Sequence, residues 1–473
     1  MQVVFFGNLR LPISSIDFEA GWGYKCKRCF LFMNGVAMRK CLIFFSICFL
    51  AAGLARAERS LTLEECVEIG LSRSTVLMNA ERDELIAESK VRQVRAQVFP
   101  QLDAEAGYTR LDEVNEIEGA DITFGRLDNY NAGLTASQLL YSGGSVSAAL
   151  NAAKDYVDVT SFGREGQRNL VVRDVTASFY EILYARTRVD VSRQSVEQLE
   201  KFEDEAHSKY KNEVISEFDW LSAKVKLANE RPKLVRDRNA LAIQKASFAK
   251  LLQLNDDEFR LEGVLEYEPL DFELSRLIKL GLKERPDLRA SESRTRLREA
   301  DVAVAKGNYM PDLNARGSYQ GTNPDQQSFA AENEWGWHWE VGLDLSWAIL
   351  DGGLRRARTM EKRLAEDKAK ADYADLRRQV KLEIRQAYLT LRHALEVVES
   401  SDEAVALAQK AYDIAEVRYS KGLSTYLEFT DSNLALSQAK LNKAQSITRY
   451  LQALADLRLA CGVDRLAEAK GNE

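Results

Sequence analysis

The chain repeats itself, and this duplication restricts its possible folds more than any other feature of the sequence. Phe99-Pro100-Gln101-Leu102 returns as Met310-Pro311-Asp312-Leu313, and Tyr141-Ser142-Gly143-Gly144 returns as Leu350-Asp351-Gly352-Gly353. In both halves, 66 residues separate the second Gly from a Tyr, at Tyr210 in the first half (210 − 144) and Tyr419 in the second (419 − 353). A spacing kept so closely predicts two rigid rods that must end at the same level.

Each half has the same order of expected elements: a helix, two strands, a long helix and a returning helix. The first helix ends just before Pro100 or Pro311, because proline forces the residue ahead of it toward extended geometry. The Gly143-Gly144 and Gly352-Gly353 pairs are the expected turns from strand into long helix. The expected helices cover 62–97, 145–209 and 216–253 in the first half and 273–308, 354–418 and 425–461 in the second.

The expected strands alternate between apolar and polar side chains, which is typical of a sheet with two different faces. They lie within 101–109, 129–140, 313–320 and 338–349. Four of the six tryptophans, Trp335, Trp337, Trp339 and Trp347, share one parity and form the expected aromatic belt of a membrane protein. The alternative is the Trp-rich core of a soluble β-sandwich.

The lengths of these elements favour a membrane pore. Sixty-five helical residues span roughly 100 Å, far more than a globular core can cover. Strands of about twelve residues match the height of an outer-membrane apolar band. Four strands cannot close a barrel and eight leave no lumen, so three copies with twelve strands are the smallest conducting solution. The expected fold is mainly α, with long antiparallel coiled-coil helices and four strands per chain in a trimeric outer-membrane β-barrel.

The N-terminal region has the pattern of an export signal. An apolar run from Cys41 to Ala55 follows Arg39-Lys40, and Ala55-Arg56-Ala57 supplies the small residues required before cleavage at Glu58. We expect translation to start at Met38 or Met33. The expected divisions are an upstream extension (1–37), a signal peptide (38–57), two repeats (58–254 and 273–462) joined by a linker (255–272), and a tail (463–473).

Composition and motifs give little support to an enzyme. The net charge of −7 argues against nucleic-acid binding, and three histidines exclude a His-rich metal site. Neither a phosphate-binding Gly loop nor a nucleophile elbow is present, so we expect no catalytic residue, cofactor or metal. Cleavage would leave Cys66 and Cys461, each in a helical pattern and each most simply a small buried residue.

Taken in order, several motifs resemble those of the TolC family of outer-membrane efflux proteins. They are Leu61-Thr62-Leu63, the two Pro-bearing helix ends, the two Gly-Gly turns and Arg418-Tyr419-Ser420-Lys421-Gly422, and the resemblance covers about 58–462. It implies a homotrimer in the Gram-negative outer membrane, with a helical tunnel across the periplasm. It further implies docking with a periplasmic adaptor and an inner-membrane transporter of the RND, ABC or MFS type. The expected function is a passive exit duct.

The resemblance also implies a constriction at the periplasmic tip. In the family, the Tyr-Ser-x-Gly turn is followed by two acidic residues that ring the narrowest part of the tunnel, which here correspond to Glu428 and Asp431. The turn itself, Gly422-Leu423-Ser424, is the expected adaptor-docking surface. The alternative is an ordinary solvated helix behind an ordinary turn. The first half departs from this pattern, with Glu213, Asp219 and Ser222 at the positions of Gly422, Glu428 and Asp431.

Other functions remain open at this stage. The duct could serve type I secretion of polypeptides instead of efflux of small molecules. A periplasmic coiled-coil adaptor or structural protein would also carry long helical hairpins, although its strands would lack the alternation described above. A secreted enzyme with helical decoration is the third alternative.

Overall fold

The computed structural model describes residues 59–113, 115–116, 123–124, 126–255, 259–325, 333–463 and 466. The described residues from Arg59 onward belong to one compact unit. The expected upstream extension (1–37) and signal peptide (38–57) lie outside the described residues, as does most of the expected tail (463–473).

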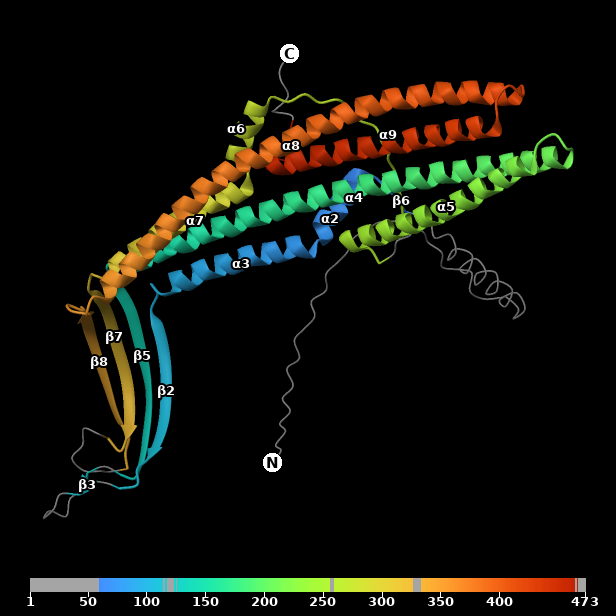
Figure 1. Ribbon diagram of the computed structural model, residues 1–473. Helices are drawn as coiled ribbons and strands as arrows, with labels where there is room; N and C mark the ends of the chain where they lie inside the picture. The colour runs from blue at the N-terminus through green and yellow to red at the C-terminus, as the bar shows by residue number, and fades with distance from the viewer. Residues whose placement is uncertain are drawn as a thin grey trace, which may run out of the picture. The chain divides into compact units, whose positions relative to one another are not determined.

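Both halves contain the predicted order of helices and strands (Figure 1). The two long helices, α4 and α8, have 67 residues each, so the prediction of two equal rods is confirmed. The first half comprises β1 (Arg59–Leu61), α2 (Leu63–Arg73), α3 (Thr75–Ala96), β2 (Gln101–Arg110), β3 (Asn115–Glu116), β4 (Thr123–Phe124), β5 (Asp128–Ser142), α4 (Ser145–Lys211) and α5 (Glu217–Leu251). After β6 (Phe259–Leu261), the second comprises α6 (Leu274–Glu284), α7 (Pro286–Gly307), β7 (Asp312–Asn323), β8 (Gly336–Ser346), α8 (Leu354–Ser420) and α9 (Tyr426–Cys461).

The first helix of each half is broken in two, so the single helices predicted over 62–97 and 273–308 are wrong in this respect. Ser74 separates α2 from α3, and its hydroxyl accepts a hydrogen bond from the Leu77 N–H at 3.3 Å, which starts a new helix. Arg285 separates α6 from α7 with a ψ of 121°, because it precedes Pro286. The break therefore has a capping cause in one half and a proline cause in the other.

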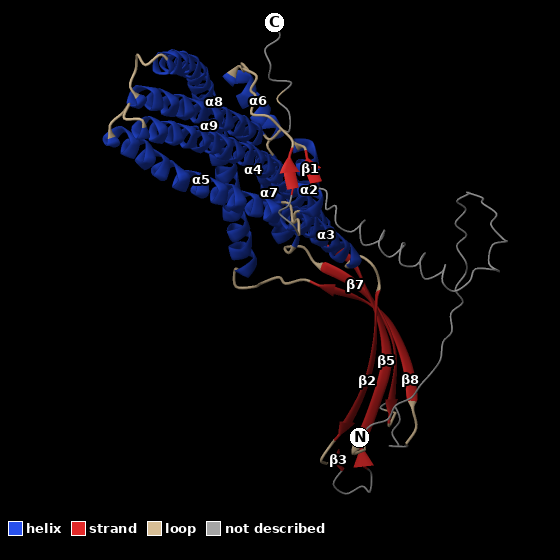
Figure 2. Ribbon diagram, turned by 90° about the vertical axis from the view of Figure 1, so that its right-hand side faces the viewer, coloured by secondary structure: helices blue, strands red, loops and turns tan. Residues whose placement is uncertain are grey.

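The four predicted strands form one antiparallel sheet in the order β2-β5-β7-β8 (Figure 2). The pairing puts Tyr319 opposite Trp339 and Leu313 opposite Leu345, so the apolar positions of neighbouring strands share one face. This face is open: Val341 is 78% exposed. The other face carries polar side chains such as Asp103 and Glu340. The strand predicted to reach 349 ends at Ser346.

Two short strands that the sequence analysis did not predict join the ends of the first half. β1 pairs in parallel with β6, which lies inside the expected linker (255–272). Leu61 in β1 is 1% exposed, and its carbonyl accepts a hydrogen bond from the Glu262 N–H at 2.9 Å. The linker is thus part of the folded unit.

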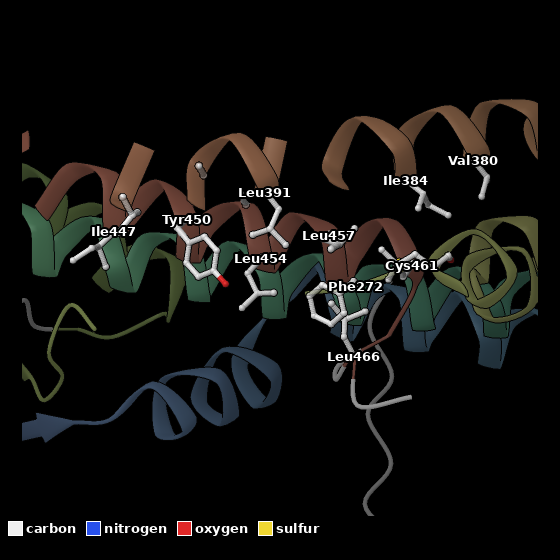
Figure 3. Packing of buried hydrophobic residues seen from close by; sticks show 14 residues of the cluster. Phe272, Val380, Ile384, Leu391, Ile447, Tyr450, Leu454, Leu457, Cys461 and Leu466 are labelled. Atoms are coloured by element: carbon white, nitrogen blue, oxygen red, sulfur yellow. Dashed lines mark hydrogen bonds between the residues drawn. The ribbon is translucent and has the colours of Figure 1, made fainter. Parts of the chain in front are cut away.

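The main hydrophobic core lies where α6, α8, α9 and the residues after β6 meet (Figure 3). Its buried members include Phe272, Val380, Ile384, Leu391, Ile447, Tyr450, Leu454, Leu457, Cys461 and Leu466. A second core contains Cys66, and both cysteines are fully buried, as predicted. Burial raises the pKa of the Cys461 thiol to about 12, so this residue remains a protonated, small apolar side chain.

None of the described helices combines the length and the apolar character needed to cross a membrane.

Tyr450 fastens the chain after β6 to the core. It is fully buried, and its hydroxyl donates to the Glu268 carbonyl at 2.7 Å and accepts from the Leu270 N–H at 3.2 Å. Replacing Tyr450 by Phe leaves both backbone groups without this partner. We expect Tyr450→Phe to lower the free energy of unfolding by about 1–3 kcal/mol in chemical denaturation.

The control for this measurement is Tyr412→Phe, because the Tyr412 hydroxyl makes a 3.5 Å contact with Glu416 at the surface. Its expected effect is within about 0.5 kcal/mol. Equal effects of the two substitutions would contradict the role of Tyr450.

Candidate functional site

The candidate site lies at the two turns that follow the long helices, at the ends of these helices that are far from the sheet (Figure 1). One turn joins α4 to α5 (212–216) and the other joins α8 to α9 (421–425). The expected gate residues, Glu428 and Asp431, follow the second turn on α9.

The two turns have the same backbone geometry with different residues. Gly422 has a φ of 70°, and Glu213 takes the corresponding place in the first turn with a φ of 65°. The next N–H group bonds back to the helix in each turn, from Leu423 to the Arg418 carbonyl at 2.8 Å and from Val214 to the Lys209 carbonyl at 2.9 Å. Leu423 is 67% exposed at the expected docking turn, with Ser424 beside it.

The acidic residues at equivalent positions of the two halves, Asp219 and Glu428, differ in whether the carboxylate forms a hydrogen bond. In the first half, the Asp219 carboxylate accepts a hydrogen bond from the Ser216 N–H at 3.3 Å and completes a capping box. In the second, the Thr425 hydroxyl accepts from the Glu428 N–H at 3.3 Å, but the Glu428 carboxylate has no ion-pair or hydrogen-bond partner among the described residues. Glu428 is therefore exposed and available to interact outside its own helix.

Asp431 joins the two hairpins through Lys226 of α5. The Lys226 ammonium lies 3.1 Å from the Asp431 carboxylate and donates to the hydroxyl of the buried Thr430 at 2.5 Å. Sequence analysis did not identify Lys226, because its two partners lie more than 200 residues away in the chain. The only signal was a difference between halves: Lys226 is ten residues after Ser216 (226 − 216), where the second half has Ala435 (435 − 425).

An aromatic cluster fixes α9 against α4 beside this ion pair. The Phe202 ring of α4 meets the Phe429 ring edge-on at 4.7 Å, and Tyr419 stacks on Phe429 at 5.3 Å. The Lys209 ammonium lies 4.6 Å from the Tyr419 ring centre and donates to its hydroxyl at 3.2 Å. Burial raises the pKa of Tyr426, another member of the cluster, to about 12.

The contact between α4 and α5 is more polar than this cluster. Asp237 is 7% exposed, pairs with Arg188 at 2.9 Å and accepts from the Ser192 hydroxyl at 2.6 Å. Pro232 lies inside α5, where it removes one helical hydrogen bond. The buried apolar cluster between these helices consists of Val196, Leu199, Leu227 and Leu234. The contact between α4 and α5 therefore has a small apolar part, and Pro232 interrupts the helical hydrogen bonding beside it.

The expected strand-to-helix turns have the backbone that glycine favours. The φ angles are 61° and 82° at Gly143 and Gly144, and 64° and 90° at Gly352 and Gly353. A Cβ atom at Gly143 would lie 2.3 Å from the Gly307 carbonyl oxygen, so that turn is also tightly packed. Pro100 and Pro311 each stand one residue before a strand.

The four tryptophans of the expected belt are exposed at the ends of β8. Trp337 and Trp339 lie within the strand, whereas Trp335 precedes it and Trp347 follows it, so the four do not share one strand. Trp335 and Trp337 stack with ring centres 5.8 Å apart. The Trp347 indole N–H donates to the Tyr309 carbonyl at 3.1 Å, which fixes the side chain where the sheet meets the helices.

No group of three or more metal-binding side chains occurs within the described part of the chain.

The chain is similar in sequence to proteins of a known family. A family model described as outer membrane efflux protein matches residues 68–253 and 277–463. Protein CyaE of Bordetella pertussis is 27% identical over 41% of this chain, and outer membrane protein OprJ of Pseudomonas aeruginosa is 26% identical over 38%. The chain spans about two fifths of the length of these two relatives (40% and 37%). The pyoverdine export outer membrane protein OpmQ of P. aeruginosa is 22% identical, with 80% of this chain and 81% of OpmQ covered.

Solved structures share the fold. The outer membrane channel CmeC of Campylobacter jejuni has a TM-score of 0.74 at 17% identity, with 85% of each chain covered. The open state of the MtrE outer membrane channel of Neisseria gonorrhoeae has a TM-score of 0.71 at 18% identity, with 85% of this chain and 89% of MtrE covered.

The two turns provide a matched test of backbone strain. A left-handed conformation costs a non-glycine residue about 1–2 kcal/mol, and glycine gives back about 0.5–1 kcal/mol through its larger unfolded-state freedom. We therefore expect Glu213→Gly to stabilise the first turn by about 0.5–1 kcal/mol and Gly422→Glu to destabilise the second by a similar amount. Hydrogen exchange at the Val214 and Leu423 amides measures both effects. Unchanged exchange in both variants would show that the turns are not strained.

Proposed function

The chain belongs to the outer membrane efflux protein family, and we propose that it is the outer-membrane channel of a tripartite export system. In this role it is a passive exit duct, and an inner-membrane transporter of the RND, ABC or MFS type drives the substrate through a periplasmic adaptor. The family is one of efflux channels and not of enzymes. The described helices and sheet would then serve as tunnel wall and membrane segment.

The observation that carries this proposal is the two-faced sheet. Its apolar face is exposed, and its opposite face is polar along all four strands. An exposed apolar face of this size is suited to lipid, and a polar face is suited to an aqueous lumen. The edge strands β2 and β8 each pair with one neighbour among the described residues. Three copies of the chain would pair these edges and close a barrel of twelve strands.

The turns at the far ends of the helices would form the closable end of the duct. Threefold symmetry would bring six carboxylates, from Glu428 and Asp431, around one axis, where they would attract cations. The Lys226–Asp431 pair would hold α5 in the closed arrangement. Asp431 is 63% exposed, and an ion pair of this kind contributes about 1 kcal/mol or less. A partner with a modest preference for the open arrangement could therefore release α5.

The adaptor would dock at Gly422, Leu423 and Ser424. Leu423 offers an exposed apolar side chain at the extreme end of the hairpin. An adaptor bound there would lie two helical turns from Asp431, close enough to act on its pairing with Lys226.

Removing the acidic pair should change both the conductance of the channel and its block by cations. We expect Glu428→Ala with Asp431→Ala to raise single-channel conductance in planar bilayers. Block by a trivalent cation should weaken by about fivefold or more. Two opposite unit charges about 4 Å apart attract each other by about 1 kcal/mol in water, which is about fivefold in affinity. The control is Ser222→Ala, at the position of the first hairpin equivalent to Asp431, because Ser222 takes no part in the cap of α5. The gate assignment fails if conductance and block stay at their wild-type values.

The sheet provides a second test, with neighbouring residues on opposite faces. Val341 is at the centre of β8 on the apolar face, and a Cβ at Gly342 would meet nothing within 4 Å on the polar face. An Arg on the lipid face near mid-depth costs about 2–4 kcal/mol. We expect Val341→Arg to reduce the yield of assembled oligomer in the outer-membrane fraction and Gly342→Arg to have little effect. Equal yields would contradict the proposed orientation of the sheet.

A further inference from the structure

We propose that the start of α8 binds the headgroups of anionic phospholipids in the periplasmic leaflet of the outer membrane. The binding surface is a basic collar around the first turns of α8, defined as Arg356, Arg358 and Arg363, directly after the apolar end of β8. Arg356 and Arg363 lie on one side of the helix, because seven residues make almost two full turns, and Arg358 lies on the opposite side. This inference rests on the proposed function, because it requires the apolar face of the sheet to lie in lipid.

The apolar surface of the sheet continues past the last residue of β8. Ile349 is 79% exposed and Leu350 is 90% exposed, the highest value among the large apolar side chains that the structure describes as exposed. Leu354, the first residue of α8, is also exposed. These side chains follow Trp347 in the chain, and Asp351, Gly352 and Gly353 separate Leu350 from Leu354. Exposed apolar side chains thus occur on both sides of the turn into α8.

The basic collar begins within three residues of this apolar surface. All three arginines are exposed, and none has an ion-pair or hydrogen-bond partner within the part of the chain that the structure describes. The neighbouring charges are already neutralised, since Arg355 pairs with Asp351 at 2.7 Å and Lys362 pairs with Glu361 at 3.2 Å. Within the described part of a single chain, the segment therefore presents three arginines that form no ion pair, and the next acidic residue without an ion pair, Asp367, lies one turn after Arg363.

The fold itself does not require these charges. The equivalent positions at the start of α4, 209 residues earlier (353 − 144), are Ser147, Ala149 and Lys154. The turn into α4 has the same glycine conformation without the arginines. Positive charges near the start of a helix are also opposed by its dipole, so they do not stabilise α8. Their place next to an exposed apolar surface points to an anionic partner at the edge of the membrane.

The collar is slightly taller than a phospholipid headgroup layer. From Arg356 to Arg363 the helix rises about 10 Å, and the headgroup region on each side of a bilayer is about 5–8 Å thick, so most of the collar could lie within it. Arginine side chains extend toward such a layer while their stems cover apolar surface. Guanidinium groups also bind phosphate with two parallel hydrogen bonds. A phosphodiester with apolar chains above it would satisfy the arginines and the apolar end of β8 together.

The experiment measures lipid binding by the mature protein in detergent micelles, using native mass spectrometry. Phosphatidylglycerol and phosphatidylcholine are added separately, and bound lipids per oligomer are counted. We expect a preference for phosphatidylglycerol, and a loss of at least about tenfold of that preference in the triple variant Arg356→Gln, Arg358→Gln, Arg363→Gln. This estimate follows from about fivefold in affinity for each basic residue near an anionic surface.

A matched control removes the same charge elsewhere on α8. Lys381, Arg385 and Lys410 are exposed and form no ion pair or side-chain hydrogen bond among the described residues. The triple variant Lys381→Gln, Arg385→Gln, Lys410→Gln should therefore keep the preference. The variant Arg356→Lys, Arg358→Lys, Arg363→Lys should keep most of it, because the charge remains. Inorganic phosphate added at the same concentration should not displace the lipid.

Conductance in planar bilayers, measured on the same samples, separates this inference from the proposed function. A channel that binds both lipids equally, or a triple Gln variant that keeps the preference, would overturn the basic collar alone. A preparation that forms no channel would overturn the proposed function and with it the membrane orientation on which the collar depends.

Discussion

The two edges of the four-stranded sheet constrain the rest of the structure, because β2 and β8 each pair with only one neighbour among the described residues. In hydrocarbon, each backbone N–H or C=O group without a partner costs several kcal/mol, so β2 and β8 cannot remain open there. Pairing them with other copies of the chain would fix the number of copies and the direction of every strand. The long helices follow the sheet after Gly-Gly turns with the same left-handed backbone in both halves, so the sheet would also set where each helix begins. The two long helices have the same length of 67 residues, as two rods that end together would need.

The two repeats share a backbone but differ in the side chains that would do the work. The first turn uses its acidic residue, Asp219, to close a cap, whereas the second leaves Glu428 exposed. The first repeat supplies Lys226, and the second supplies its partner Asp431. The arginines at the start of α8 have neutral residues at two of three equivalent positions in α4. The two halves thus share one architecture and differ in the side chains to which we assign the proposed roles at each end.

Much of the fold was predictable because it depends on local patterns. Strict alternation predicted the four strands, and the repeat spacing predicted two long helices of equal length. The break at Arg285 was also visible in principle, because Pro286 follows it, but the prediction relied only on the proline at the end of this segment, Pro311. β1 and β6 were missed because strands of three residues are too short to show a period. Lys226 was missed because its pairing with Asp431 is a tertiary contact across 205 residues.

The parallel pairing of β1 with β6 has a consequence for the time order of folding. Arg59 lies opposite Phe259, so 200 residues (259 − 59) must be made before the earliest strand meets its partner. A polypeptide that crosses a membrane from its N-terminus onward would hold Leu61 exposed in the destination compartment throughout that interval. β1 would therefore be the last element of the first repeat to pair. Until then, its exposed Leu61 would be an early binding site for a chaperone.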